Sequence, residues 1–448
     1  MFKRILVSNR GEIAVRIIRA CRELGIECVA VYSTADKDSI HTKLADSSIC
    51  IGPPPPSKSY LNIESIISAA TVAKCDALHP GYGFLAENPE FEESCRENGI
   101  TFIGPPSEVI SLSGNKSLAV EVMRKHRIPV IAGSGGNVEK LRHALKISKR
   151  LGYPVIIKAS FGGGGKGMRI CRNKEELVSL FPLAKSESVS SFGKSEVYIE
   201  KYIQKPKHIE FQIIADNYGN VVCVGERECS IQRRHQKLIE EAPAPGLSAR
   251  ARKIIKEYAV RAAHAINYKN LGTIEFLVDE CENFYFMEIN SRIQVEHPVT
   301  EMVTGLDLIK EQIKIAAGQK NSHTGRDFES NGNAIEFRIN AEDSEHNFIP
   351  SAGKILDYFL PGGPGIRVDT FIHSNYTIPH FYDSLIAKLV IWGLSREEAL
   401  SRSMRALNEF RVEGIKTTIP FHKKILSNES FRSGQIHTHF IEEEFNNI

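Results

Sequence analysis

Residues 287–301 read MEINSRIQVEHPVTE, and this stretch indicates both the kind of fold and the place of a site. Successive side chains of a β-strand point to opposite faces of a sheet. As a strand, the segment would place mainly apolar side chains on one face and a continuous polar row on the other. The polar row consists of Glu288, Asn290, Arg292, Gln294 and Glu296. We therefore predict a strand that gathers carboxylate, amide and guanidinium groups on one face.

Three other segments, HIEFQII, TIEFL and IEFRIN, alternate in the same way. The residues that share a face are His208, Glu210 and Gln212 in the first, Thr273, Glu275 and Leu277 in the second, and Glu336, Arg338 and Asn340 in the third. One apolar and one polar face are typical of an antiparallel sheet that packs one side on a core. Solvent exposure would explain one such strand. Four strands rich in Glu, Asn, Gln, His and Arg favour a ligand or metal site, because these groups are costly to gather without a neutralising partner.

The N-terminal segment has a different pattern. An apolar run at 5–8 is followed by a helical pattern over about 12–24, then Gly25 and a second apolar run at 28–32. This order predicts a βαβ unit and a parallel sheet. The intervening turn, SNRGEIA, lacks GxGxxG, so the dinucleotide-binding fingerprint is absent.

A glycine-rich segment, GGGGKG at 162–167, lies between two predicted strands. It is not a Walker A motif, because Lys166 is followed by Gly167 rather than by Ser or Thr and a helix. The N–H groups of consecutive glycines can approach phosphate oxygens, and such a loop can move as a cover over a site. A merely flexible hairpin is the alternative. Lys116 and Lys158 supply two further cations for a polyphosphate.

A magnesium nucleotide also needs carboxylates, since Mg²⁺ is held by one or two of them together with phosphate oxygens and water. Glu275 and Glu288 suit this role, because they occupy inward faces of successive predicted strands joined by the turn DECENF (279–284). Asn290 lies in the same row as Glu288 and can assist.

Composition bounds the class of protein. The 448 residues suffice for two or three domains, and a net charge of +3 gives no reason to expect a nucleic-acid partner. No run of 18 apolar residues predicts a membrane span, and the N-terminus lacks the apolar core of a secretory signal. The nine cysteines form no CxxC pair, which predicts reduced thiols buried in the core of a cytoplasmic protein.

Five motifs together resemble biotin carboxylase, an ATP-grasp enzyme, and the resemblance covers essentially the whole chain. The motifs are HPGYGFLAEN (79–88), KASFGGGGKGM (158–168), ERECSIQRRHQKLIEEAPAP (226–245), MEINSRIQVEHPVTE (287–301) and INAED (339–343). The match is to the separate biotin carboxylase subunit of bacterial-type acetyl-CoA carboxylase. It implies an α/β fold, in part α+β: a parallel-sheet α/β domain at 1–114, a glycine-rich lid at 115–205, and at 206–448 the ATP-grasp core with a C-terminal domain on a large antiparallel sheet.

The resemblance also implies the residues that bind ATP and Mg²⁺ or Mn²⁺. Lys116 and Lys158 contact the nucleotide, and Gly164 and Gly165 lie over its phosphates. The adenine pocket is lined by Glu200, Lys201, Tyr202 and Ile203, while His208 and His235 lie near the ribose and phosphates. The metal ions are held by Glu275, Glu288 and Asn290.

By the same resemblance, ATP phosphorylates bicarbonate to carboxyphosphate, and the CO₂ released from it is captured by the ureido nitrogen of biotin, leaving ADP and phosphate. Arg292 forks onto bicarbonate, as a guanidinium does with planar oxyanions. The other groups beside bicarbonate are Lys237, Gln294 and the N–H of Val295. Glu296 is the expected general base, and Arg338 is expected to stabilise the enolate of biotin.

Two positions depart from the family pattern. Phe161 stands where the family usually has Gly, and Lys166 where it usually has Arg. Lysine keeps the positive charge but lacks the planar fork of arginine, so closure of the lid is expected to differ in detail.

The resemblance also bears on partners. Multifunctional relatives such as pyruvate carboxylase carry a Met-Lys-Met biotin acceptor, which none of the six methionines here forms. We therefore expect biotin to arrive on another chain, a biotin carboxyl carrier protein, with carboxyltransferase subunits beyond it and malonyl-CoA for fatty acid synthesis as the product. The family implies a homodimer. The alternatives are a subunit of another acyl-CoA or pyruvate carboxylase, a different ATP-grasp ligase that forms an acyl-phosphate, and a non-catalytic nucleotide-binding protein. Intact acidic positions, Glu275, Glu288 and Glu296 among them, oppose the last.

Overall fold

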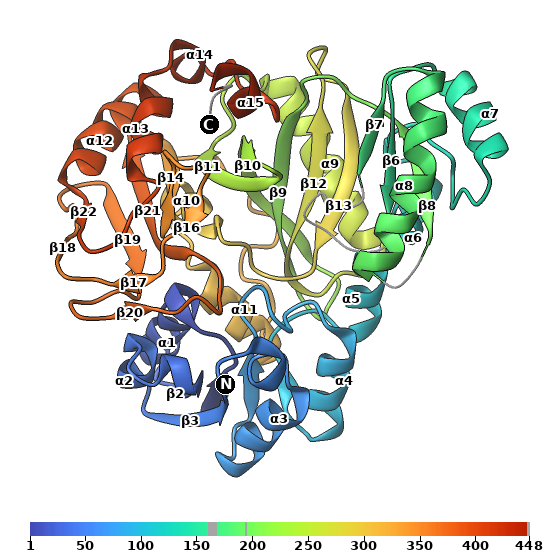
Figure 1. Cartoon of the computed structure of the whole chain (residues 1–448). Helices are drawn as coiled ribbons and strands as arrows, with labels where there is room; N and C mark the ends of the chain where they lie inside the picture. The colour runs from blue at the N-terminus through green and yellow to red at the C-terminus, as the bar shows by residue number, and fades with distance from the viewer. Residues whose placement is uncertain (160–167, 193–194, 446–448) are drawn as a thin grey trace.

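The computed structural model describes residues 1–159, 168–192 and 195–445 (Figure 1). Three principal sheets organise the described chain. A five-stranded sheet is formed by the N-terminal part, drawn in blue at the bottom of Figure 1. A three-stranded sheet with its helices stands at one side, and an eight-stranded sheet runs through the centre.

The N-terminal sheet is parallel, with strand order β3-β2-β1-β4-β5. Its strands are β1 (Arg4–Val7), β2 (Glu27–Ser33), β3 (Ser47–Gly52), β4 (Ala77–His79) and β5 (Thr101–Phe102). Its helices are α1 (Gly11–Glu23), η1 (Thr34–Asp36), α2 (Ile40–Leu44), η2 (Pro56–Lys58), α3 (Ile63–Val72), α4 (Pro89–Glu97) and α5 (Ser107–Gly114). Ile5, Leu6 and Val7 are fully buried, as expected for a parallel strand covered on both faces. The predicted βαβ unit is confirmed.

The three-stranded sheet is antiparallel, with order β7-β6-β8. Its strands are β6 (Val155–Ala159), β7 (Arg169–Cys171) and β8 (Val197–Lys201), and the helices beside it are α7 (Leu141–Leu151) and α8 (Lys174–Phe192). The strands predicted on either side of GGGGKG are therefore confirmed, and they pair with each other. Phe161, Gly164, Gly165 and Lys166 lie outside the described residues.

The eight-stranded sheet is antiparallel, with order β13-β12-β9-β10-β11-β14-β21-β19. Its strands are β9 (Lys207–Ala215), β10 (Val221–Arg233), β11 (Gln236–Ala242), β12 (Asn270–Val278), β13 (Phe284–Asn290), β14 (Asn333–Asn340), β19 (Ile366–Thr370) and β21 (Leu385–Gly393). The helices that belong to this part are α6 (Lys116–Lys125), α9 (Ala249–Ala265), α10 (His297–Thr304), α11 (Leu308–Ala316), α12 (Arg396–Glu409), α13 (Ile419–Ser427), α14 (Glu429–Arg432) and α15 (Phe440–Glu444). Three two-stranded pairs complete the described strands: β15 (Glu342–Asp343) with β16 (Ile349–Pro350), β17 (Gly353–Lys354) with β20 (Thr377–Ile378), and β18 (Tyr358–Phe359) with β22 (Arg411–Val412).

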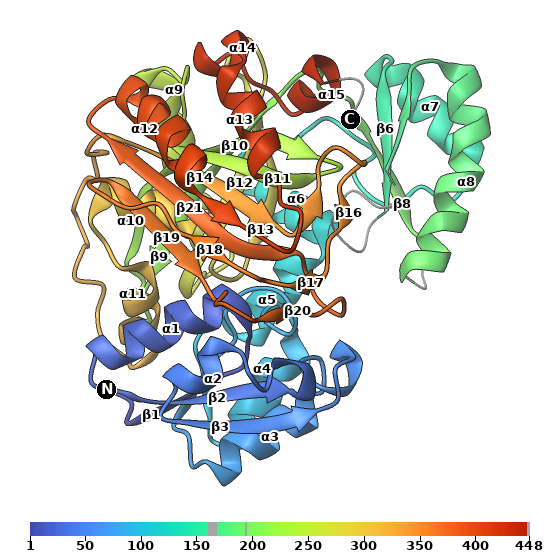
Figure 2. The same ribbon diagram turned by 60° about the vertical axis from the view of Figure 1, so that its left-hand side comes forward.

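The predicted separation of the large sheet into an apolar and a polar face is confirmed. Apolar side chains such as Ile209 and Phe211 pack with α6 and α9 at one end of the sheet, and Phe337 packs with α12 and α13 at the other. Figure 2 shows α12 and α13 in front of β14 and β21. The opposite face carries Glu210, Arg227 and other polar groups and is covered by α10. Both residues are fully buried, so this face is not a solvated one.

The prediction that 287–301 forms one strand is wrong beyond Asn290. β13 ends there, residues 291–296 are irregular, and α10 begins at His297 with Pro298 in its first turn. β13 is the edge strand of the described sheet, and its outer side makes only an isolated bridge at Phe286, so the chain beyond Asn290 can leave the ladder. Proline fits the first turn of a helix, where its missing N–H is not needed. The chain thus turns back over the polar face of the sheet.

The cysteines are free, as predicted, but Cys50 and Cys281 are exposed rather than buried in the core. Cys50 lies on β3, where alternate residues face outwards, and Cys281 lies in the turn between β12 and β13. Among the described helices, none is long and apolar enough to cross a membrane.

Candidate active site

A cavity of about 680 Å³ opens over the polar face of the large sheet and receives residues from all three principal parts of the fold. Tyr82 comes from the N-terminal part, Lys158 from the three-stranded sheet and Arg338 from the large one. The residues selected from the sequence that line it are Lys116, Lys158, Lys201, Tyr202, Ile203, His208, His235, Lys237, Glu275, Glu288, Asn290, Arg292, Gln294, Val295, Glu296 and Arg338. Glu200 does not line it. The irregular segment after β13 is not a strand, but its polar side chains still line this cavity.

Two carboxylates stand opposite each other at the edge of the sheet. Glu275 on β12 and Glu288 on β13 are direct cross-strand partners. The Nδ2 of Asn290 donates to Oε1 of Glu275 at 2.7 Å, and Lys116 Nζ lies 2.7 Å from Oε2 of Glu288. Carboxylate and amide oxygens are the ligand set that Mg²⁺ prefers, so these residues fit the ion that a bound nucleotide would bring.

Glu275 is held in its ionised form. Burial would raise the pKa of this carboxyl, but Lys237 and His208 hold it well below its ordinary value. His208 Nε2 is 2.7 Å from Oε2 of Glu275, and burial, which would lower the histidine pKa, is outweighed by that carboxylate. The imidazole of His208 is therefore held by one of the carboxylates that could bind a metal ion.

Lys237 is the centre of the charge cluster. Its Nζ lies 2.5 Å from Glu210, 3.1 Å from Glu275 and 2.6 Å from Glu296. One ammonium group thus partners three buried carboxylates, which would otherwise be costly to bring together. Burial would lower the pKa of Lys237, but the three carboxylates hold it well above its ordinary value.

Glu296 lies between two cations. Oε1 accepts from Lys237, and Oε2 accepts from Nη2 of Arg338 at 2.9 Å. Burial would raise the pKa of Glu296, but Lys237, Arg338 and Arg227 together keep it below its ordinary value. The carboxylate is therefore ionised and can accept a proton once these cations turn to a substrate.

Arg338 is itself oriented by a residue that sequence reasoning missed. Its Nε donates to Oε1 of Glu240 at 2.6 Å, while Nη2 binds Glu296. Glu240 is fully buried on β11, and burial raises its pKa to about 7 despite the arginine. Glu240 lies in the motif at 226–245, and its place opposite Glu336 puts it on the polar face of the sheet.

Arg292 is held by another missed residue. Its Nε donates to Oε2 of Glu87 at 2.9 Å and its Nη2 to Oδ1 of Asn290 at 3.2 Å. Glu87 lies in the HPGYGFLAEN motif, far from Arg292 in sequence. Its Nη1 also donates to the carbonyl of Ile293 at 3.2 Å, so the guanidinium is held at all three nitrogens; it lines the cavity, where it suits a small planar oxyanion.

Arg227 is a third missed residue and the largest fully buried side chain described. Its guanidinium donates to several side chains around it, namely Glu210, Gln212, Thr273, Gln294 and Thr300. These bonds join β9, β12, α10 and the segment before it. Arg227 therefore holds the irregular segment against the sheet.

On the side of the three-stranded sheet, Lys158 Nζ binds Oε2 of Glu200 at 2.7 Å, so Glu200 holds a residue that lines the cavity without lining it itself. The Nζ of Lys201 donates to the carbonyl of Gly152 at 3.0 Å. Tyr202 and His439, from α15's N-cap position, share a hydrogen bond of 2.7 Å. His235 occupies the turn between β10 and β11, and burial lowers its pKa.

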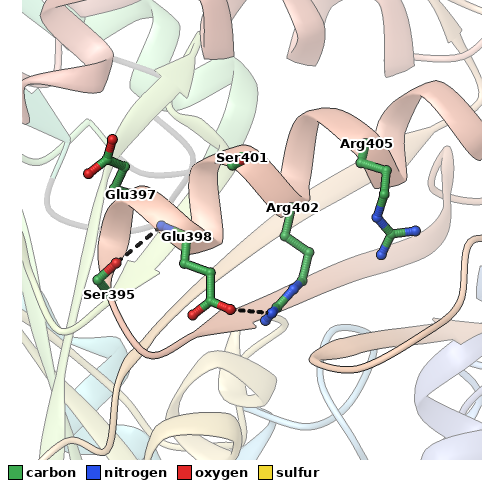
Figure 3. Close-up of a pocket in the computed structure, with 6 residues that line it drawn as sticks. All are labelled: Ser395, Glu397, Glu398, Ser401, Arg402 and Arg405. Atoms are coloured by element: carbon green, nitrogen blue, oxygen red, sulfur yellow. Dashed lines mark hydrogen bonds and ion pairs between the residues drawn. The ribbon is translucent and has the colours of Figure 1, made fainter.

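A second hollow lies against α12 and shares no residue with this cavity (Figure 3). Both of its lining cations are already partnered: Arg402 binds Glu398 at 2.5 Å, and Arg405 binds Glu409 at 2.7 Å. Ser395 caps the helix by accepting from the N–H of Glu398. These contacts stabilise α12 and leave the cavity as the candidate active site.

Three family models match consecutive parts of the chain. They are described as the biotin carboxylase N-terminal domain at residues 1–110, the ATP-binding domain of the carbamoyl-phosphate synthase L chain at 115–324, and the biotin carboxylase C-terminal domain at 336–443.

Full-length relatives agree with these matches. The chain is 54% identical to biotin carboxylase 1 of Bacillus subtilis over 443 residues, 99% of this chain and 98% of that one. It is 50% identical to the biotin carboxylase of Haemophilus influenzae over 445 residues, 99% of each chain.

Solved structures agree as well. A biotin carboxylase complex from Campylobacter jejuni has a TM-score of 0.96 and 47% identity, with 99% of each chain covered. The biotin carboxylase domain dimer of the Hydrogenobacter thermophilus 2-oxoglutarate carboxylase, in complex with MgADP, ADP and bicarbonate, has a TM-score of 0.95 and 49% identity, covering 100% of this chain and 98% of that one.

Proposed function

This chain belongs to the biotin carboxylase family of ATP-grasp enzymes, and from that premise we propose that it uses ATP and bicarbonate to carboxylate biotin. The products are carboxybiotin, ADP and phosphate. The observation that carries the proposal is the placement of Glu296 between Lys237 and Arg338, within one cavity that also holds the carboxylates Glu275 and Glu288.

Bicarbonate is bound beside Arg292, whose guanidinium is preset by Glu87. Lys237, Gln294 and the N–H of Val295 line the same region of the cavity. Lys237 can pass from the carboxylate of Glu296 to the new anion, since both are within reach of one flexible side chain. Glu296, relieved of that cation, then becomes a stronger base and takes the proton of bicarbonate.

The deprotonated bicarbonate oxygen attacks the γ-phosphorus of ATP, ADP leaves, and carboxyphosphate forms. Seven residues that line the cavity are assigned to the nucleotide by the family resemblance. Lys116 and Lys158 offset phosphate charge, Lys201, Tyr202 and Ile203 contact the base, and His208 and His235 lie near the ribose and phosphates. A Mg²⁺ or Mn²⁺ ion held by Glu275, Glu288 and Asn290 would supply charge neutralisation at the phosphates. From the sequence resemblance alone, Gly164 and Gly165 are expected to lie over the phosphates.

Carboxyphosphate breaks down to CO₂ and phosphate, and the released phosphate takes the N–H proton of the ureido group of biotin. Negative charge gathers on the ureido oxygen of this enolate, where Arg338 is proposed to stabilise it, and the ureido nitrogen then attacks CO₂ to give carboxybiotin. Glu240 supports this role by holding Nε and Nη2 of the guanidinium, each 2.6 Å from its Oε1.

We further propose the division into 1–114, 115–205 and 206–448, supported by the separate sheets of these parts, with α6 contacting the large sheet. A homodimer is supported by the dimeric relative from Hydrogenobacter thermophilus. A cytoplasmic location is supported by free cysteines, seven of which are buried.

For the final acceptor we propose acetyl-CoA, reached through a biotin carboxyl carrier protein and carboxyltransferase subunits. Relatives named for pyruvate and for 2-oxoglutarate carboxylation have similar identity, 53% and 50%, so this choice rests on the motif resemblance. Turnover with purified biotinylated carriers from each class of carboxylase separates the alternatives, because the cognate carrier should give the highest kcat/KM.

The decisive test is ATP hydrolysis by the full chain that requires bicarbonate and is stimulated by biotin. Glu296→Gln should abolish both the bicarbonate-dependent hydrolysis and its stimulation by biotin, because it removes the base while keeping the shape of the side chain. Glu280→Gln, in the exposed turn after β12, is the matched control. Hydrolysis that ignores bicarbonate would refute the proposal.

A further inference from the structure

Lys388 is a fully buried lysine that has no role in the proposed mechanism. It lies on β21, directly opposite Arg338 on β14, and so shares the polar face of the large sheet. Its Nζ donates to the carbonyl oxygen of Val295 at 3.0 Å and lies 3.1 Å from Oε2 of Glu12. A buried lysine is costly unless its charge is paired and its donors are used.

The carbonyl that Lys388 binds belongs to the segment proposed to hold bicarbonate. The N–H of Val295 is the proposed donor to that anion, and the Val295 carbonyl joins directly to Glu296. The preceding carbonyl, of Gln294, accepts from Nδ1 of His297 at 2.8 Å. Both peptide groups that flank Val295 are thus fixed through their carbonyl oxygens, one by His297 and one by Lys388.

This fixation is needed because the segment lies outside any ladder. Residues 291–296 follow the end of β13, so no strand among the described residues orients their peptide groups. A peptide N–H binds an anion well only when its direction is set beforehand. His297 holds the peptide that carries the Val295 N–H, and Lys388 on β21 holds the next peptide, so that Val295 is fixed on both sides.

The partner of Lys388 connects this segment to the other half of the cavity. Glu12, on α1, is buried, and its Oε1 accepts from the hydroxyl of Tyr82. Tyr82 lines the cavity within the HPGYGFLAEN loop, whose backbone is held by Asn9 Nδ2 through the Tyr82 carbonyl at 2.8 Å. A continuous chain of contacts therefore runs from Tyr82 through Glu12 and Lys388 to Val295.

We propose that Lys388 is a positioning residue for bicarbonate, which fixes the Val295–Glu296 peptide beside the anion-binding N–H of Val295 and is itself held by Glu12. This rests on the proposed function, since it assigns a further residue to the same site. The structural alternative is that Lys388 serves only to neutralise the buried carboxylate of Glu12.

The test compares the full-length wild type with Lys388→Met and with the double variant Lys388→Met and Glu12→Gln. The double variant removes both buried charges together, and the amide oxygen that replaces the carboxylate at position 12 still accepts from Tyr82. It therefore avoids the unpaired buried charge that could unfold the single variant. Lys256→Met is the matched control, because Lys256 lies on α9, against the apolar face of the sheet, and pairs there with Asp327.

Binding of ¹³C-labelled bicarbonate in the presence of MgADP is followed by NMR line broadening, and turnover supplies the KM values. The double variant should bind bicarbonate about tenfold more weakly and show a similar rise in its KM, with the KM for ATP changed by less than about twofold. Wild-type affinity for bicarbonate in the double variant would overturn the proposal and leave Lys388 as a neutralising partner. Absence of bicarbonate binding by the wild type would instead refute the proposed function itself.

Discussion

Oε2 of Glu296 lies 2.9 Å from Nη2 of Arg338, so the proposed base and the proposed enolate-stabilising group are ion-paired before substrates bind. The pair has to open for either group to act. Binding of bicarbonate and biotin supplies new partners for both, which couples the basicity of Glu296 to occupancy of the cavity. The resting enzyme therefore holds its base in a weakly basic state.

The first prediction concerns the pH dependence of turnover. Arg338 helps to keep the pKa of Glu296 below its ordinary value, although burial opposes it. In Arg338→Gln that pKa rises, so Glu296 becomes protonated at a higher pH and activity is lost earlier on acidification. We expect the acid limb of bicarbonate-dependent ATP hydrolysis without biotin to move up by about one pH unit.

The control for this shift is Arg261→Gln on α9, which stacks on Tyr258 away from the cavity. An unchanged acid limb in Arg338→Gln would mean that another group than Glu296 governs the profile.

The second prediction concerns Glu87, which orients Arg292 across 205 residues of sequence. Glu87→Gln keeps the size of the side chain but loses the charged hydrogen bond to Nε. We expect the KM for bicarbonate to rise about three- to tenfold and the KM for ATP to stay the same. An equal rise in both constants would show that Glu87 acts on the cavity as a whole.

Glu90→Gln, on the exposed first turn of α4, is the matched control for Glu87. Its steady-state constants should equal those of the wild type.

The alternation of polar and apolar residues predicted the faces of β9, β12 and β14, because parity is a local property of a strand. It failed after Asn290, where the chain leaves the sheet at its edge. The position of an edge depends on the strand order of the whole sheet, which local periodicity does not contain. The lining residues were nevertheless identified, because the family motif describes the site rather than the strand.

Three of the residues that sequence reasoning missed share one property. Glu87, Glu240 and Lys388 act through a contact with a segment far away in sequence, and none reacts in the proposed mechanism. Their side chains are ordinary in composition, and only the tertiary fold shows which functional group each one holds. Glu200 illustrates the reverse, since the family resemblance placed it at the nucleotide, whereas its carboxylate pairs with Lys158 and does not line the cavity.

The third prediction concerns the metal ion. Glu288 faces Glu275 across the strands and is bound by Lys116 at 2.7 Å. Glu288→Gln removes one of the two opposed carboxylates, so a divalent ion loses a charged ligand. We expect the Mg²⁺ concentration for half-maximal turnover at saturating ATP to rise about tenfold or more, and kcat to fall. A Mg²⁺ titration of Glu280→Gln should match that of the wild type, and a wild-type titration curve for Glu288→Gln would exclude it as a ligand.

The fourth prediction concerns stability and Glu228, which lies on the face of β10 opposite to the cavity side. Its carboxylate is fully buried, accepts from the N–H of Ser230 at 3.0 Å, and has Lys207 Nζ only 3.8 Å away. Burial raises its pKa to about 7 against the attraction of Lys207. The folded protein therefore holds a proton on Glu228 in a pH range where the unfolded chain has released it.

Because the folded state binds more protons between about pH 4.5 and pH 7, its stability falls as the pH rises through this window. Glu228→Gln removes this penalty, which is at most about 3 kcal/mol. The Tm of the variant, compared with that of the wild type, should therefore increase from pH 5.5 towards about pH 8 in differential scanning fluorimetry. Glu97→Gln, exposed at the end of α4, should show no such trend. A Tm difference that is constant with pH, or that decreases as pH rises, would show that Glu228 is ionised in the folded protein throughout the range.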